Sequence, residues 1–162
     1  IARSRGGKAA TRGMSREHVP MLMARDRSGA TTDFVLPADR IAEVSAVLQP
    51  PLGEFWFENM GDMNYFNLRT PADLALIGDV GLTLDTGHAH LNHCLPAFLE
   101  TPFRHMHIHD NKGKADTHGP VGSGTIDFRP VMAALRRIHA TAVIEVKTFV
   151  AAKSSLQVLD AL

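Results

Sequence analysis

Short apolar runs alternate with segments of helical spacing over the last two thirds of the chain. Four runs predict strands, at residues 54–59, 80–85, 103–110 and 141–146. The segments after them predict helices, at 70–78, 88–100 (in part), 126–140 and 150–162. Thr70 is the expected N-cap of the first helix, with Pro71 at its first position. Strands that alternate with helices predict βα units and a parallel sheet.

The first 52 residues have a different pattern. Two short apolar runs, at 19–26 and 31–37, flank a Ser-Gly turn and predict a β-hairpin. Residues 38–49 have apolar side chains at helical spacing and predict an amphipathic helix. The PPLG stretch at 50–53 ends this helix. We therefore expect two parts, an N-terminal segment over 1–52 and an α/β part over 53–162.

Charge is divided at a similar place. The chain has 17 Lys and Arg against 17 Asp and Glu, but residues 1–30 carry seven basic residues and only two acidic ones. The rest of the chain is therefore acidic. Nucleic-acid binding rests mainly on cationic contacts with phosphates, so we expect no more than weak, non-specific binding of nucleic acid, through residues 1–30.

Two further features concern the location of the protein. Cys94 is the single cysteine, which excludes an internal disulfide framework and fits a reducing compartment. No run of about 18 apolar residues occurs, so no membrane span is expected. We expect a cytoplasmic protein.

Each of the four predicted strands of the α/β part has, at or near its end, a residue that can bind a metal. These residues are Glu58, Asp85, His107 and Glu145. A single carboxylate after a strand is most often a helix N-cap or a solvated loop residue. Four such residues at equivalent strand ends would converge on one face of a parallel βα barrel, where active sites lie. Oxygen and imidazole ligands in this mixture suit Mn²⁺, Mg²⁺, Co²⁺ or Zn²⁺.

Histidine is concentrated around the third of these strands. Four of the nine histidines lie in HMHIHDNKGKADTH at 105–118. His105, His107 and His109 alternate with apolar residues, so we expect all three on one face of the strand. Some of them are expected to be structural groups, and three other histidines are expected to be structural or on the surface, namely His90, His93 and His139.

Several separated motifs resemble the xylose-isomerase-like TIM-barrel superfamily, which holds sugar isomerases and epimerases together with endonuclease IV (AP endonuclease family 2). The motifs are FENM (57–60), LTLDTGHAH (82–90), HMHIHDNKGKADTHGPVGSG (105–124) and VIEVK (143–147). The resemblance covers about residues 53–162. It implies the C-terminal half of a TIM (β/α)8 barrel, with about four βα units.

The resemblance also implies roles for individual residues. It implies a divalent metal bound by Glu58, Asp85, His107 and Glu145, and a small sugar or sugar phosphate as substrate. Glu58 and Glu145 would be the catalytic residues that remove and return a proton through a metal-stabilised enediolate. The residues that endonuclease IV uses for a further zinc are matched by His88, Asp116 and His118. Substrate contacts are implied for His109 and Asn111.

The resemblance leaves two other functions open. One is an endonuclease IV-like, zinc-dependent AP endonuclease, which the D-x-H pair at 116–118 favours slightly. The other is a non-enzymatic chimeric remnant with a basic arm that touches DNA, because residues 5–50 resemble a fragment of a DDE-type insertion-sequence transposase. The superfamily barrel needs about 250 residues, and only about 110 resemble it here. We therefore expect a truncated, inactive or weakly active domain.

A half barrel has two open sheet edges. If the chain folds, we therefore expect a homo-oligomer rather than a stable monomer, or an edge covered by the N-terminal hairpin.

Overall fold

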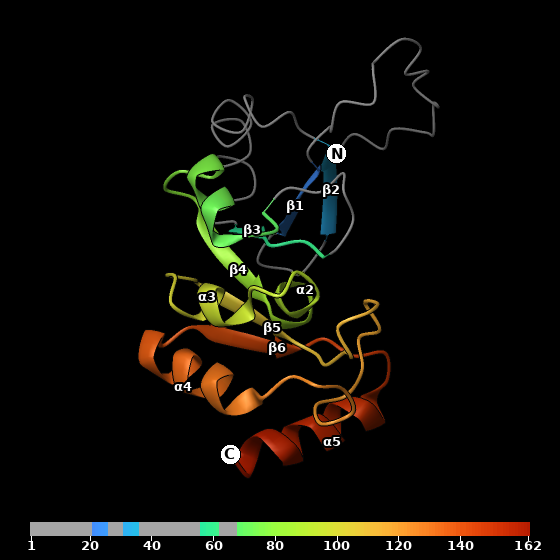
Figure 1. Ribbon diagram of the computed structural model, residues 1–162. Helices are drawn as coiled ribbons and strands as arrows, with labels where there is room; N and C mark the ends of the chain where they lie inside the picture. The colour runs from blue at the N-terminus through green and yellow to red at the C-terminus, as the bar shows by residue number, and fades with distance from the viewer. Residues whose placement is uncertain (1–20, 26–30, 36–55, 62–67) are drawn as a thin grey trace, which may run out of the picture.

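The computed structural model describes residues 21–25, 31–35, 56–61 and 68–162, the first two stretches by their backbone alone (Figure 1). A six-stranded sheet with the order β2-β1-β3-β4-β5-β6 forms the centre of this part of the chain. Its last four strands are parallel, namely β3 (Trp56–Glu58), β4 (Gly81–Asp85), β5 (His105–Ile108) and β6 (Thr141–Ile144). Helices follow these strands, so the predicted α/β class and partial TIM barrel are confirmed.

The predicted hairpin consists of β1 (Met21–Arg25) and β2 (Thr31–Val35), which pair antiparallel. Strand β1 also pairs antiparallel with β3, and Ala24 lies opposite Phe57. The hairpin therefore occupies the edge of β3 (Figure 1). Of the two alternatives expected for the open edges, an oligomer or a covering hairpin, the hairpin is present at this edge. The helix expected at 38–49 lies outside the described residues.

Five helices accompany the parallel strands in the described part of the chain: η2 (Pro71–Leu76), α2 (Thr86–Leu91), α3 (Leu95–Leu99), α4 (Phe128–Ile138) and α5 (Phe149–Asp160). The segment 70–78 forms a 3-10 helix, whose first turn is fixed because the Asp73 carboxylate accepts the backbone N–H groups of Arg69 and Thr70. Residues 88–100, expected to be partly helical, contain most of α2 and all of α3. Helix α2 begins earlier than expected, at Thr86, because Asp85 caps it.

Alternate side chains divide the parallel sheet into an apolar face and a polar face. The apolar face packs against the helices in one core, which includes Leu82, Leu84, Met106, Ile108, Phe98, Val131 and Leu159. The polar face carries Glu58, Thr83, Asp85 and His107, all of them buried. Burial of several ionisable groups side by side is costly unless they are paired or bind a metal, which directs attention to this face.

Strand β6 forms the other end of the sheet, and its residues 141–143 are exposed. Phe149 and Val150 at the start of α5 are exposed as well. Exposed apolar groups beside a strand edge fit the expected oligomer, which stays a prediction. None of the described helices combines the length and apolarity that crossing a membrane requires.

Candidate metal centre

Four side chains from the carboxyl ends of the four parallel strands meet on the polar face. The Nδ1 atom of His107 lies 3.3 Å from Glu58 Oε1, 3.8 Å from Asp85 Oδ2 and 3.0 Å from Glu145 Oε2. One ligand atom from each of the four lies within 4.8 Å of all the others. Tetrahedral ligands with bonds near 2.1 Å stand about 3.4 Å apart. The predicted quartet is therefore a compact set, and three carboxylates with one imidazole fit a divalent cation.

Asp85 is placed by the turn from β4 into α2. It is the N-cap of α2, and its Oδ1 atom accepts the backbone N–H of His88 at 2.7 Å. Both readings of a carboxylate after a strand therefore apply to Asp85, because it caps a helix and also faces the quartet. Capping fixes its rotamer, and with it the direction of both carboxylate oxygens.

Asn59 joins the ends of β3 and β4. Its side-chain amide donates to the carbonyl of Asp85 at 3.0 Å and accepts the N–H of Asp85 at 2.6 Å. The backbone oxygen of Asn59 lies 2.9 Å from Nδ1 of His88. Sequence reasoning missed Asn59, although it follows Glu58 directly within the FENM motif.

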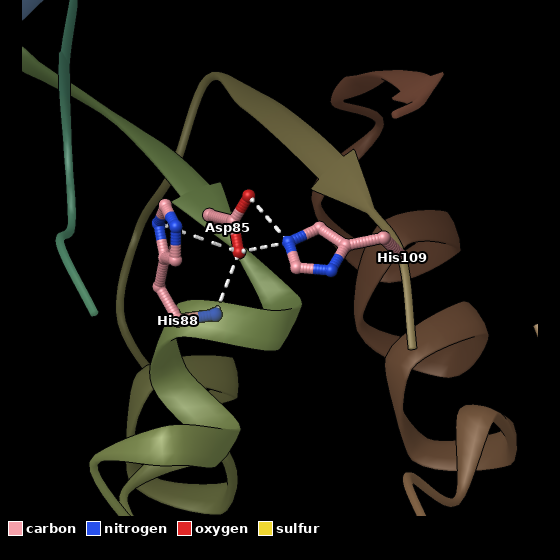
Figure 2. Close-up of side chains that lie close together, drawn as sticks. All are labelled: Asp85, His88 and His109. Atoms are coloured by element: carbon pink, nitrogen blue, oxygen red, sulfur yellow. Dashed lines mark hydrogen bonds and ion pairs between the residues drawn. The ribbon is translucent and has the colours of Figure 1, made fainter. Parts of the chain in front are cut away.

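A second group of metal-capable side chains shares Asp85 with the quartet. Figure 2 shows Asp85 between His88 and His109, whose Nε2 atom lies 3.0 Å from Asp85 Oδ1. Ligand atoms of Asp85, His88 and His109 lie within 4.8 Å of one another, and those of His109, Asp116 and His118 do as well. We call these five residues the second cluster. His88, Asp116 and His118, which the resemblance implied for a further metal, are all in it.

The rings of the second cluster are packed closely. The imidazoles of His109 and His118 stack with centroids 4.2 Å apart. A Cβ atom on Gly87 would lie 2.0 Å from Cε1 of His109, so the ring occupies its place only because residue 87 is glycine. His118 has a φ of 47°, in the left-handed region that non-glycine residues seldom adopt.

Neighbouring charges control the pKa values of the quartet. Burial lowers the pKa of His107, but the carboxylates of Glu145 and Glu58 raise it more, to about 9. Burial raises the pKa of Asp85, but His88 and His109 lower it by a larger amount, to about 2. At neutral pH the metal-free quartet therefore holds a protonated imidazole beside an ionised Asp85.

In the second cluster, burial and neighbouring groups also shift the pKa values in opposite directions. Burial lowers the pKa of His88, but Asp85, Asp116 and Glu58 raise it to about 10. A hydrogen bond with Asp116 raises the pKa of His118. Burial raises the pKa of Asp116, and its hydrogen bonds with His118 and His88 lower it well below the usual range.

Metal binding at the quartet is expected to release a proton. Metal ligands bind in the deprotonated form, and the pKa of His107 is about 9, so one ion bound at pH 7 should displace about one proton. Affinity should therefore rise about tenfold per pH unit from pH 7 until the pH passes the pKa. Calorimetric titration in buffers of different ionisation enthalpy measures this release. Binding at pH 7 without proton release would contradict it.

The two residues expected to contact substrate are both buried. His109 is 0% exposed and Asn111 is 1% exposed. The Asn111 amide donates to the carbonyl of Gly87 and accepts the N–H of Gly113, so both of its polar ends are used within the chain. This geometry indicates that Asn111 supports the site, while substrate contact by either residue stays a prediction.

Comparison with known proteins identifies the class. A model of the xylose isomerase-like TIM barrel family matches residues 24–162, and the chain belongs to that family. The match begins before residue 53, so it includes part of the segment assigned to 1–52. The boundary near residue 52 and the transposase-like character of residues 5–50 stay predictions.

Two curated proteins are similar to part of this chain. The uncharacterised protein MJ1614 of Methanocaldococcus jannaschii is 36% identical over 94 residues, which are 56% of this chain and 38% of that protein. MJ1311 of the same organism is 33% identical over 75 residues, which are 43% of this chain and 26% of that protein. The chain therefore spans well under half of the length of these curated relatives.

Two solved structures share the fold. The crystal structure of a D-tagatose 3-epimerase-like protein superposes with a TM-score of 0.66 over 77% of this chain and 52% of that one, at 25% identity. The TTHB071 protein from Thermus thermophilus, in a structure of crystals soaked with ZnCl2, has a TM-score of 0.54 over 76% of this chain and 53% of that one, at 23% identity. This chain corresponds to about half of each.

Proposed function

We propose that this chain carries the metal centre of a sugar isomerase or epimerase that acts by proton transfer. The observation that carries the proposal is the quartet, in which four strands in succession each supply one metal-capable side chain to a single point. The membership of the chain in the xylose isomerase-like family and the likeness to a D-tagatose 3-epimerase-like protein support a sugar or sugar phosphate as substrate.

The residues divide the chemistry among them. Glu58, Asp85, His107 and Glu145 would hold a divalent ion, which would supply Lewis-acid polarisation of a sugar carbonyl. Glu58 ends β3 and Glu145 follows β6, and strand β5 with His107 lies between these two strands in the sheet. One of them removes the proton from the carbon next to the carbonyl, and the other returns a proton to the opposite face.

The proposal is tested by proton exchange, which needs no knowledge of the product. The chain is incubated in D₂O with Mn²⁺, Co²⁺ or Zn²⁺ and a panel of ketoses and ketose phosphates, and NMR follows deuterium at the carbons beside the carbonyl. We expect exchange with at least one sugar, and a loss of about 100-fold or more in Glu58→Gln, because general-base catalysis contributes about 10²–10⁴. No exchange with any sugar by a chain that binds metal would overturn the proposal.

The second cluster favours one other function. It offers places for a second ion beside the first, and paired ions about 4 Å apart serve phosphodiester cleavage. The alternative is therefore a zinc-dependent phosphodiesterase of the endonuclease IV kind. If the chain cleaves an oligonucleotide duplex with one abasic site and leaves the undamaged duplex uncut, this alternative is favoured over sugar chemistry. The basic residues 1–30 add only the expectation of weak, salt-sensitive DNA binding.

A further inference from the structure

Asp110 is a buried carboxylate outside both metal-capable clusters. It follows β5, next to His109, and is 1% exposed. Its carboxylate accepts three backbone N–H groups, from Gly122 at 3.0 Å, Gly124 at 2.8 Å and Ile126 at 3.2 Å. A carboxylate that accepts several N–H bonds forms strong, charge-assisted contacts. Asp110 therefore gathers residues 122–126 around one point.

The backbone of Asp110 closes a loop as well. Its N–H donates to the carbonyl of Gly119 at 2.8 Å, and the N–H of Gly119 donates back at 2.9 Å. The segment from 110 to 119 therefore leaves Asp110 and returns to it. Asp116 and His118 lie on this loop, so their positions depend on the closure.

The glycines of the segment serve this carboxylate. A Cβ on Gly124 would lie 2.2 Å from Oδ1 of Asp110 and 2.2 Å from the carbonyl oxygen of Asn111. Gly122 has a φ of +87°, which glycine adopts without strain. The glycines at 122 and 124 are thus accounted for by contacts within the chain. Ser155 on α5 adds a separate anchor, because its hydroxyl accepts the N–H of Val121.

The strained conformation of His118 needs an external cause. Its φ of 47° persists only where the surrounding structure determines it. The closure at Gly119 lies directly after His118, and the hydroxyl of Thr117 directly before it donates to the carbonyl of Asp110 at 3.4 Å. The backbone of Asp110 therefore bonds to the residues on both sides of His118, to the backbone of Gly119 and to the hydroxyl of Thr117.

We propose that Asp110 is a positioning residue, which fixes Asp116 and His118 for binding of a cation at the second cluster through its bonds to the 119–126 backbone. This inference rests on the proposed metal-binding function. Its own carboxylate takes no part in either cluster among the described residues.

The test is titration of the metal-free full chain with Co²⁺, followed by visible absorption, in wild type and Asp110→Asn. The substitution keeps the size of the side chain but turns one acceptor oxygen into a donor that faces an N–H group. We expect the first equivalent to bind with unchanged affinity and spectrum, and the second to bind at least tenfold more weakly with an altered spectrum. Asp127→Asn is the matched control, because Asp127 also accepts a backbone N–H but lies on the surface at the start of α4. It should change neither equivalent.

A metal-free measurement separates this inference from the proposed function. Hydrogen exchange of the amides of Gly122, Gly124 and Ile126 should be faster in Asp110→Asn by at least tenfold, with the core of β4 and β5 unchanged. If the wild-type chain binds no second equivalent, binding of a cation at the second cluster is overturned. The exchange data then still show whether the Asp110 carboxylate holds the 122–126 backbone. Unchanged exchange, or an unchanged second equivalent, in a folded Asp110→Asn would overturn the role of Asp110. Equal weakening of both equivalents would also overturn it, because that is the result of general destabilisation.

Discussion

We expect the His107→Ala, Glu145→Gln double variant to lose affinity for the first divalent ion by more than about 100-fold. His107 is the only nitrogen ligand of the quartet, and its Nδ1 atom lies within 3.8 Å of all three carboxylates. Loss of a supporting contact behind a metal ligand already costs about 10- to 100-fold, so the removal of two ligands should exceed that. Metal content after dialysis and titration with Mn²⁺, Co²⁺ and Zn²⁺ measure the loss.

The control changes the same residue types on the surface. His93 and Glu100 are both exposed, and His93 has a φ of 56°, which asparagine tolerates better than alanine. A His93→Asn, Glu100→Gln chain should keep about one equivalent of metal. If wild type and double variant hold the same amount of metal, the quartet is not the binding site. If neither holds any, the motifs persist without a working centre.

The second large effect is expected on stability, from Asp85→Asn. Asp85 is 0% exposed and lies 3.0 Å from His109 and 3.6 Å from Nδ1 of His88. His88 is protonated at neutral pH, with a pKa of about 10. Removal of one partner of a buried ion pair costs about 3–5 kcal/mol, and the carboxylates of Asp116 and Glu58 near His88 offset part of this cost. We therefore expect the metal-free chain to lose about 3 kcal/mol of unfolding free energy at pH 7.

Urea denaturation at pH 7 measures this loss, with Asp127→Asn as control. Asp127 caps α4 at the surface, and asparagine is about as good an N-cap as aspartate, so this control should lose little stability. The raised pKa of His88 sets the pH dependence: its stabilisation is complete below the unfolded pKa of about 6.5 and is lost as pH rises through about 10. The difference between wild type and Asp85→Asn should therefore shrink from pH 7 to pH 10. A loss below about 1 kcal/mol at pH 7 would contradict the prediction.

The quartet could be predicted because its members occupy equivalent places in repeated local units. Glu58, Asp85 and His107 each end a short apolar run, and parallel strands bring such ends to one edge by their geometry alone. Helix α4 was predictable for a similar reason, since its buried Phe128, Val131 and Ala134 follow the helical period.

The remaining features depend on partners distant in sequence. The pairing of β1 with β3 joins segments far apart along the chain and follows from no local pattern. Asn59 acts on Asp85, and Asp110 acts on Gly122 and Gly124. The partners of these side chains are backbone groups, which every residue has, so residue type does not reveal them. Only the glycines at 122 and 124 give a signal in the sequence. The early start of α2 at Thr86 was missed because Asp85 was not used as a cap.

The two glutamates of the quartet differ in their contact with water. The side chain of Glu58 is 3% exposed, whereas that of Glu145 is 26% exposed. A proton held by Glu145 can pass to bulk solvent between catalytic events, and a proton held by Glu58 is kept from it. Under the proposed chemistry, hydrogen delivered from Glu145 would bear the isotope of the solvent, whereas Glu58 would deliver a hydrogen that it had removed from a sugar in an earlier turnover in the opposite direction. Forward and reverse reactions would thus leave different isotopic records in the sugar.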